Sequence, residues 1–200
     1  MSDFAYNGHL KTGSSTTDAR GGGGGDYSRT MMTRDKSKPQ ILKQELVAQS
    51  RLFKVEALHL RFTNGTERIY ERMQGGHRGA VMLVPLLDDE TLLLVREYAA
   101  GTHSYELGFP KGVIDAGENA AQAGNRELME ETGYGARELI PLKPLALAPG
   151  FFASRMDLLL ARDLSPEWRE GDEPEPLELV PWPLAEAERL LDEPDFNESR

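Results

Sequence analysis

Three glutamates lie close together near the middle of the chain: Glu127, Glu130 and Glu131. On a helix, residues three and four positions apart share a face, so this spacing directs the three carboxylates to one surface. Crowded carboxylates repel one another and cannot all stay ionised without compensation. Divalent cations that prefer oxygen ligands, Mg²⁺ or Mn²⁺, would supply it. The spacing therefore predicts a metal-binding surface.

The residues around these glutamates predict a loop, a helix and a helix end. Gly112 and Gly117 mark a tightly bent loop. Asn119 suits the N-cap of the following helix, and Gly133 suits the position just after its last turn. Small or apolar side chains lie about a quarter-turn from the carboxylates and are expected to pack on a sheet: Ala121, Gly124 and Leu128.

The same stretch resembles the Nudix box, Gly-x5-Glu-x7-Arg-Glu-U-x-Glu-Glu-x-Gly-U, in which U is a bulky apolar residue. The positions in register are Gly112, Glu118, Arg126, Glu127, Leu128, Glu130, Glu131 and Gly133. The final U is Tyr134, which is aromatic rather than aliphatic. A surface helix with solvated charges is the alternative, but it explains neither the glycine loop nor the three acids on one face.

The resemblance implies hydrolysis of a nucleoside diphosphate that is linked to another moiety. The implied ligands of Mg²⁺ or Mn²⁺ are Glu127, Glu130, Glu131 and the carbonyl of Lys111. Glu130 also counts among the implied catalytic residues. Arg126 is expected to brace the loop by pairing with Glu118 rather than to touch the substrate. A bound metal lowers the pKa of its water from about 15.7 to about 7 in favourable cases.

A second acidic segment, residues 171–176 (GDEPEP), precedes a predicted strand. It resembles the Glu-x-Glu loop of ADP-ribose pyrophosphatases, a branch of the Nudix family. On that match Glu173 is the general base and Glu175 is a metal-facing acid. A solvated acidic loop remains the alternative.

The segments REY and YELGFPKG ahead of the box, and the strands before them, also resemble this branch. The resemblance runs from about Lys38 to the end of the chain and implies ADP-ribose, NADH and diadenosine polyphosphates as substrates, with release of AMP. In this branch arginines grip the diphosphate and the N-terminal strands cross to a partner subunit, so a homodimer is expected. Members usually continue with a further helix, so a C-terminal truncation is expected here.

The expected substrate-binding residues are Arg96, Arg72, Glu71, Glu106 and Tyr105. Arg96 is the first candidate for the diphosphate, because a guanidinium fits phosphate with two parallel hydrogen bonds. Arg72 and Glu71 are expected to act across the dimer interface. Tyr105 or Tyr98 would stack on adenine.

Two other functions stay open. One is a Nudix hydrolase for a different nucleoside diphosphate derivative, such as a nucleotide sugar or coenzyme A. The other is a Nudix module that senses a ligand without turnover. The intact acids at Glu127, Glu130 and Glu131 argue against the sensor, because a sensor does not need the full metal-binding face.

Composition and net charge exclude further classes of protein and of chemistry. The chain has 200 residues and no cysteine, so disulfides and thiolate chemistry are excluded, and a cytoplasmic protein is expected. The formal net charge of −10 argues against binding to nucleic-acid backbones. No apolar run is long enough to span a bilayer, and the N-terminus does not resemble a signal peptide.

Three regions are predicted. Residues 1–38 are expected to be a disordered tail, with Met31 or Met32 as a candidate start. Residues 39–78 should form an antiparallel strand pair with a turn at Asn64-Gly65, packing on the main domain or across a dimer. Residues 79–200 should form an α/β domain, an α/β/α sandwich with a mixed central sheet, as the Nudix fold also implies. The expected strands are 41–62, 67–73, 80–86, 91–95, 139–147, 156–161 and 177–182, and residues 184–191 have helical spacing.

Overall fold

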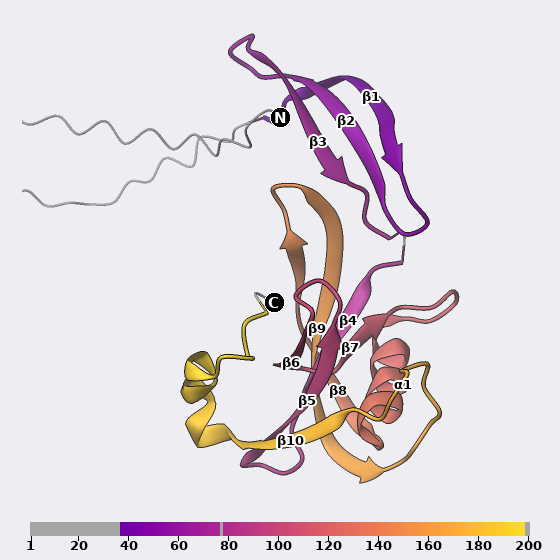
Figure 1. Ribbon diagram of the computed structural model, residues 1–200, viewed down its shortest axis with the longest axis vertical. Coiled ribbons are helices and arrows are strands. Elements are labelled where there is room, and N and C mark those ends of the chain that lie inside the picture. Colours follow the sequence, from indigo (N-terminus) through magenta and orange to yellow (C-terminus); the bar gives the residue numbers. More distant parts are fainter. Residues whose placement is uncertain (1–36, 77, 199–200) are drawn as a thin grey trace, which may run out of the picture. The chain divides into compact units, whose positions relative to one another are not determined.

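The computed structural model describes residues 37–76 and 78–198, and from residue 38 onward these belong to one compact unit, Lys38–Arg200. The tail predicted for residues 1–38 lies outside the described residues up to residue 36, as do Met31 and Met32. Figure 1 shows the order of the helices and strands along the chain.

The predicted antiparallel strands before the main domain are present, and there are three of them: β1 (Gln40–Gln49), β2 (Lys54–Arg61) and β3 (Glu67–Met73). The run predicted over 41–62 divides because Ser50 closes a turn. Its backbone N–H donates to the Phe53 carbonyl at 2.8 Å, and its hydroxyl oxygen accepts from the Phe53 N–H at 2.9 Å. The predicted turn at Asn64-Gly65 joins β2 to β3, and Gly65 has a φ of 81°, which suits glycine.

The main domain is a mixed sheet with a second, smaller sheet beside it. In the larger sheet β4 pairs in parallel with β9 and antiparallel with β7, while β9 pairs antiparallel with β8. The smaller sheet has the order β10-β5-β6. The strands are β4 (Ala80–Pro85), β5 (Thr91–Ala99), β6 (Ser104–Gly108), β7 (Lys111–Val113), β8 (Tyr134–Ala148), β9 (Phe152–Pro166) and β10 (Glu178–Pro183).

One helix, α1 (Ala120–Thr132), packs against β4, β7 and β8 (Figure 1). Leu128 is fully buried in this contact, and Gly124 lets the helix approach closely, since a Cβ there would lie 3.0 Å from the Leu83 side chain. The prediction that Ala121 also packs on the sheet is wrong. Ala121 is exposed, and Ala120 and Ala123 pack on the core instead, because the four-residue steps back from Leu128 and Gly124 lead to Ala120 and not to Ala121.

The helical layer opposite α1 is formed by η1, a 3₁₀ helix over Leu184–Asp192. Its Leu190 packs with Leu92, Leu94 and Leu107 in a second apolar cluster. The mixed sheet between two helical layers confirms the predicted fold class, with a 3₁₀ helix where residues 184–191 were predicted to have helical spacing. Within residues 37–76 and 78–198, no helix is long and apolar enough to cross a membrane.

Candidate active site

The helix that carries the three glutamates is fixed at both ends as predicted. The Asn119 side chain accepts from the Gln122 N–H, and the Gln122 side chain accepts from the Asn119 N–H, which completes a capping box. Gly133 ends the helix with a φ of 73°. Gly112 lies so close to the helix that a Cβ there would come within 1.9 Å of the Glu127 carboxyl carbon. The loop and the carboxylate face are therefore held in contact.

Arg126 joins the loop to two of the glutamates. Its guanidinium donates to both carboxylate oxygens of Glu118, at 2.9 and 3.1 Å, and to the Val113 carbonyl at 2.8 Å. This is the predicted brace, and the pairing lowers the pKa of Glu118. The same guanidinium also donates to Glu127 at 2.7 Å and to Glu130 at 2.9 Å. The positive charge of Arg126 thus partly neutralises the carboxylates of Glu127 and Glu130.

Glu131 is the least compensated of the three glutamates. It is buried, and the Lys111 backbone N–H donates to it at 3.2 Å. Burial raises its pKa to about 8; the Lys111 charge opposes the shift, while the carboxylates of Glu97 and Glu127 add to it. The Lys111 ammonium itself contacts Glu97, at 2.8 Å. A bound cation would compensate the charge of a buried carboxylate in this position.

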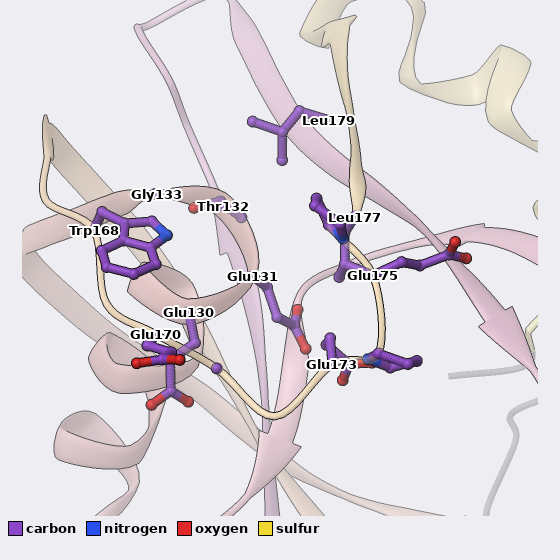
Figure 2. A pocket seen from close by; sticks show the side chains of 13 residues that line it. Glu130, Glu131, Thr132, Gly133, Trp168, Glu170, Glu173, Glu175, Leu177 and Leu179 are labelled. Atoms are coloured by element: carbon purple, nitrogen blue, oxygen red, sulfur yellow. The ribbon is translucent and has the colours of Figure 1, made fainter.

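Glu127, Glu130 and Glu131 line one hollow of about 520 Å³, together with Glu173 from the loop between β9 and β10. Burial, and next the Glu97 carboxylate, raises the pKa of Glu173. Figure 2 shows the neighbouring hollow, where Glu131 and Glu173 extend toward the same space. The structure therefore brings the three helix glutamates and Glu173, the predicted general base, to one hollow, which Glu175 does not line.

Comparison with known proteins identifies the family. Residues 76–198 match the NUDIX domain, and residues 39–72 match the NudE-type Nudix hydrolase N-terminal domain. The chain belongs to the Nudix family. It is 57% identical over 169 residues to ADP compounds hydrolase NudE of Escherichia coli (strain K12), covering 84% of this chain and 90% of that one.

Other relatives agree with this assignment. ADP-ribose pyrophosphatase of Bacillus subtilis (strain 168) is 28% identical over 158 residues, covering 76% of this chain and 84% of its own. A crystal structure of an ADP compounds hydrolase superposes with a TM-score of 0.77 at 57% identity, covering 82% of this chain and 88% of that chain. The Nudix fold implied by the resemblance is confirmed, and the chain is a Nudix pyrophosphohydrolase.

Nudix hydrolases generally need a divalent metal ion. The donor set of this Nudix box fits such an ion, because carboxylate oxygens are its usual ligands and no Lys or Arg side chain in the described residues contacts Glu131. As the side chains stand, no three acidic or histidine side chains of the described residues are grouped closely enough to hold an ion. Arg126 and Arg169 contact Glu130 instead, at 2.9 and 3.0 Å.

Sequence reasoning missed two members of the Nudix site, Glu97 and Arg169. Alternation along β5 was the available signal for Glu97, since it shares a face with the buried Leu93 and Val95. Arg96 takes the other face, where Glu178 and Asp195 bind its guanidinium at 2.6 and 2.8 Å. No comparable pattern marks Arg169.

The other predicted substrate residues are also engaged within the chain. Glu106 accepts from Ser104, Thr102 and Asn197 at 2.6 to 2.8 Å, and the first two hydrogen bonds lower its pKa most. Tyr105 donates its hydroxyl to Glu175 at 2.5 Å. Figure 2 shows the Glu175 side chain pointing away from Glu131.

Arg72 and Glu71 lie outside the hollow at the Nudix helix. Among the described residues, β1, β2 and β3 contribute nothing to its lining. Arg72 donates to the buried Glu56 at 2.5 Å and lines a separate hollow beside Phe151. Glu71 is exposed on β3. Both could reach a Nudix site only in another subunit.

Proposed function

We propose that this enzyme hydrolyses the pyrophosphate bond of ADP-linked compounds, such as ADP-ribose, NADH and diadenosine polyphosphates, and releases AMP. The observation that carries the proposal is the shared hollow of Glu127, Glu130, Glu131 and Glu173 in a chain 57% identical to ADP compounds hydrolase NudE. The carboxylates supply a place for the metal, and the second acidic loop supplies a proton acceptor.

Glu127, Glu130, Glu131 and the Lys111 carbonyl would hold Mg²⁺ or Mn²⁺. When bound, such an ion polarises the phosphoryl oxygen and makes a water molecule more acidic. The work of the protein is then positioning and charge stabilisation. Arg126 holds the helix against the loop through Glu118, so the acid face keeps its place during turnover.

Glu173 would act as the general base. It lies across the hollow from the helix, and burial raises its pKa from that of an ordinary glutamate toward neutrality. A base works best when its pKa is near the working pH. Glu173 would take the proton from the attacking water, while Glu130, on the facing helix, would help to orient that water.

Arg96 remains our candidate for gripping the diphosphate. Its guanidinium is bound by Glu178 and Asp195, at 2.6 and 2.8 Å. An incoming diphosphate would have to replace one of these carboxylates, which it can do because two oxygens of one phosphoryl group can accept side by side from the guanidinium. Glu106 would lie beside the same part of the substrate, and Tyr105 would stack on adenine.

We further propose that the enzyme is a homodimer that pairs through the N-terminal strands. β1 and β3 expose several large apolar side chains: Ile41, Leu46, Val47, Ile69 and Tyr70. A cluster of this kind on a sheet is typical of a protein interface. A dimer would also carry Arg72 and Glu71 toward the active site of the partner subunit. Sedimentation of the Ile69→Glu variant as a monomer would support this assignment, and an unchanged dimer would contradict it.

The function is tested by incubating the protein with ADP-ribose, NADH and diadenosine triphosphate in the presence of Mg²⁺ or Mn²⁺ and measuring AMP release. A nucleotide sugar and coenzyme A serve as comparison substrates. Preferred release of AMP from the first three supports the proposal. Faster cleavage of a comparison substrate would assign another Nudix substrate, and binding without turnover would indicate a sensor.

A further inference from the structure

The loop of residues 167–177 crosses from the Nudix helix to the smaller sheet, and it is anchored on the helix side. Arg169 binds the Glu130 carboxylate at 3.0 Å. The backbone at Gly171 also runs close to the helix, since a Cβ there would lie 3.2 Å from the Glu130 Cβ. This end of the loop is therefore tied to one of the metal-ligand candidates.

The other end of the loop, just before β10 pairs with β5 at Glu178, is held on the sheet side by a side-chain hydrogen bond. The Tyr105 hydroxyl, on β6, donates to the Glu175 carboxylate at 2.5 Å. The Tyr105 ring is itself supported by the edge of Tyr98, with ring centroids 5.7 Å apart, and Tyr98 contacts His103 at 2.7 Å. Because Glu175 raises the pKa of Tyr105, the phenol keeps its proton and remains a donor.

The two prolines of the loop restrict the backbone between Glu175 and Glu173, so holding Glu175 also restricts Glu173. Pro174 and Pro176 have a fixed φ, and the residue before each proline is restricted to extended conformations. The backbone from Glu173 to Pro176 therefore has few alternatives. Fixing the side chain of Glu175 limits where Glu173, two residues earlier, can lie in the hollow.

We propose that Tyr105 and Glu175 form a latch that positions the loop, and through it Glu173, against the Nudix helix. This inference rests on the proposed function. It makes both residues positioning residues, in place of a metal-facing acid at Glu175 and an adenine-stacking ring at Tyr105. The hydrogen bond joins residues 70 positions apart in sequence, and it holds the loop three residues before β10 begins to pair with β5 at Glu178.

A double-mutant cycle tests the latch. Tyr105→Phe and Glu175→Ala are each expected to lower kcat by about tenfold or more, within the roughly 100-fold cost of a 1 Å misplacement, with a smaller change in KM. The double variant should be no slower than either single variant, because the same hydrogen bond is lost. Effects that multiply, or a Tyr105→Phe enzyme as fast as the wild type, would overturn the proposal.

Glu175→Gln separates the latch from a metal-facing role. The amide oxygen still accepts from the Tyr105 hydroxyl, so kcat should stay within about threefold of the wild type, as for a retained hydrogen bond. Mn²⁺ affinity, measured by electron paramagnetic resonance, should also be unchanged. A metal ligand would instead lose affinity with its charge. Glu167→Gln, an exposed acid of the same loop that does not line the hollow, controls for the loss of one negative charge and should match the wild type.

Amide hydrogen exchange tests the latch without turnover. Prolines have no amide proton, so the reporters are residues 171–173, 175 and 177. Tyr105→Phe should speed their exchange by roughly threefold to tenfold, the effect of one exposed hydrogen bond, while Glu167→Gln should not. Faster exchange in a protein that releases no AMP would keep the latch and sink the proposed function. Unchanged exchange would sink the latch, whatever the activity.

Discussion

Two buried glutamates of this chain, Glu56 in the N-terminal strands and Glu131 on the Nudix helix, have pKa values displaced in opposite directions. Glu56 is 2% exposed and accepts from Gln74, Arg72 and Gln44 at 2.5 to 2.9 Å, and these hydrogen bonds, with that from Gln74 first, lower its pKa. Glu131 is 8% exposed, accepts one backbone N–H at 3.2 Å, and has its pKa raised to about 8 by burial.

Both carboxylates are shielded from solvent, but they differ in partners and in depth: burial is the main cause of the pKa shift at Glu131, while hydrogen bonds outweigh it at Glu56. A buried carboxylate that is fully hydrogen-bonded stabilises its surroundings, while one that is left short of partners is costly unless a cation arrives. Glu56 therefore belongs to the architecture of β1, β2 and β3. Glu131 belongs to a site, because its unmet charge would be met by a ligand. The number and spacing of acidic residues in the sequence do not distinguish a structural glutamate such as Glu56 from a functional one such as Glu131.

The comparison is sharpened first by Glu173, whose pKa is raised like those of Glu127 and Glu131 in the same hollow. Glu173→Gln should lower kcat by about 10²- to 10⁴-fold, the usual contribution of a general base, with a small change in KM. Stopped assays of AMP release give both constants. A loss below about tenfold would not fit a general base and would leave the raised pKa of Glu173 without a catalytic role.

Glu131→Gln comes next. Hydrolysis should fall by about 10²- to 10³-fold, as for the loss of one preorganised electrostatic group, because the amide cannot replace the charge that the cation needs. Glu56→Gln is the control, since it makes the same change at a glutamate of similarly low solvent exposure outside the hollow. Undiminished hydrolysis in Glu131→Gln would end the proposed role of the acid face.

Much of this site could be predicted because its determinants are local. Asn119 and Gly133 fix the helix ends through neighbours in sequence, and the resemblance to the Nudix box implied the ion pair of Arg126 with Glu118. Ala121 was misplaced because four-residue steps back from Leu128 and Gly124 lead to Ala120, which packs on the core.

The parts that escaped prediction depend on distant pairings. Glu97 meets Lys111 from a different strand, and Arg169 meets Glu130 from a loop after the sheet. Tyr105 finds Glu175 across 70 positions. Such contacts follow from the order of strands in the two sheets, and no periodicity in one segment reports it. The alternation of side chains along one strand does predict which face of the sheet a residue lies on.

The pH dependence of stability should separate the two glutamates again. Glu131 has a pKa of about 8 when folded and 4.5 as the ordinary value, so the folded protein holds a proton that the unfolded chain releases. Its unfolding free energy without metal should therefore fall, by a few kcal/mol, as pH rises from about 4.5 through about 8. Urea unfolding in a chelator measures this slope. Glu131→Gln should flatten it, and Mg²⁺ should reduce it; a slope that survives the substitution would assign it to other groups.

Glu56 should behave in the opposite way, with the smallest effect. Its pKa is lowered from 4.5, so its stabilising contribution is present above that pH and is lost as pH falls through its folded value. Glu56→Gln should cost about 1–3 kcal/mol at neutral pH, because the Arg72 guanidinium loses its charged partner and a buried amide N–H₂ meets the Gln74 and Gln44 donors. Urea unfolding at neutral pH measures the loss, and the Glu56→Gln curve should converge with the wild-type curve in acid. Glu131→Gln should stabilise the protein at high pH in the absence of metal. If Glu56→Gln also stabilised it, burial alone would determine how both glutamates affect stability, and their hydrogen-bond partners would make no difference.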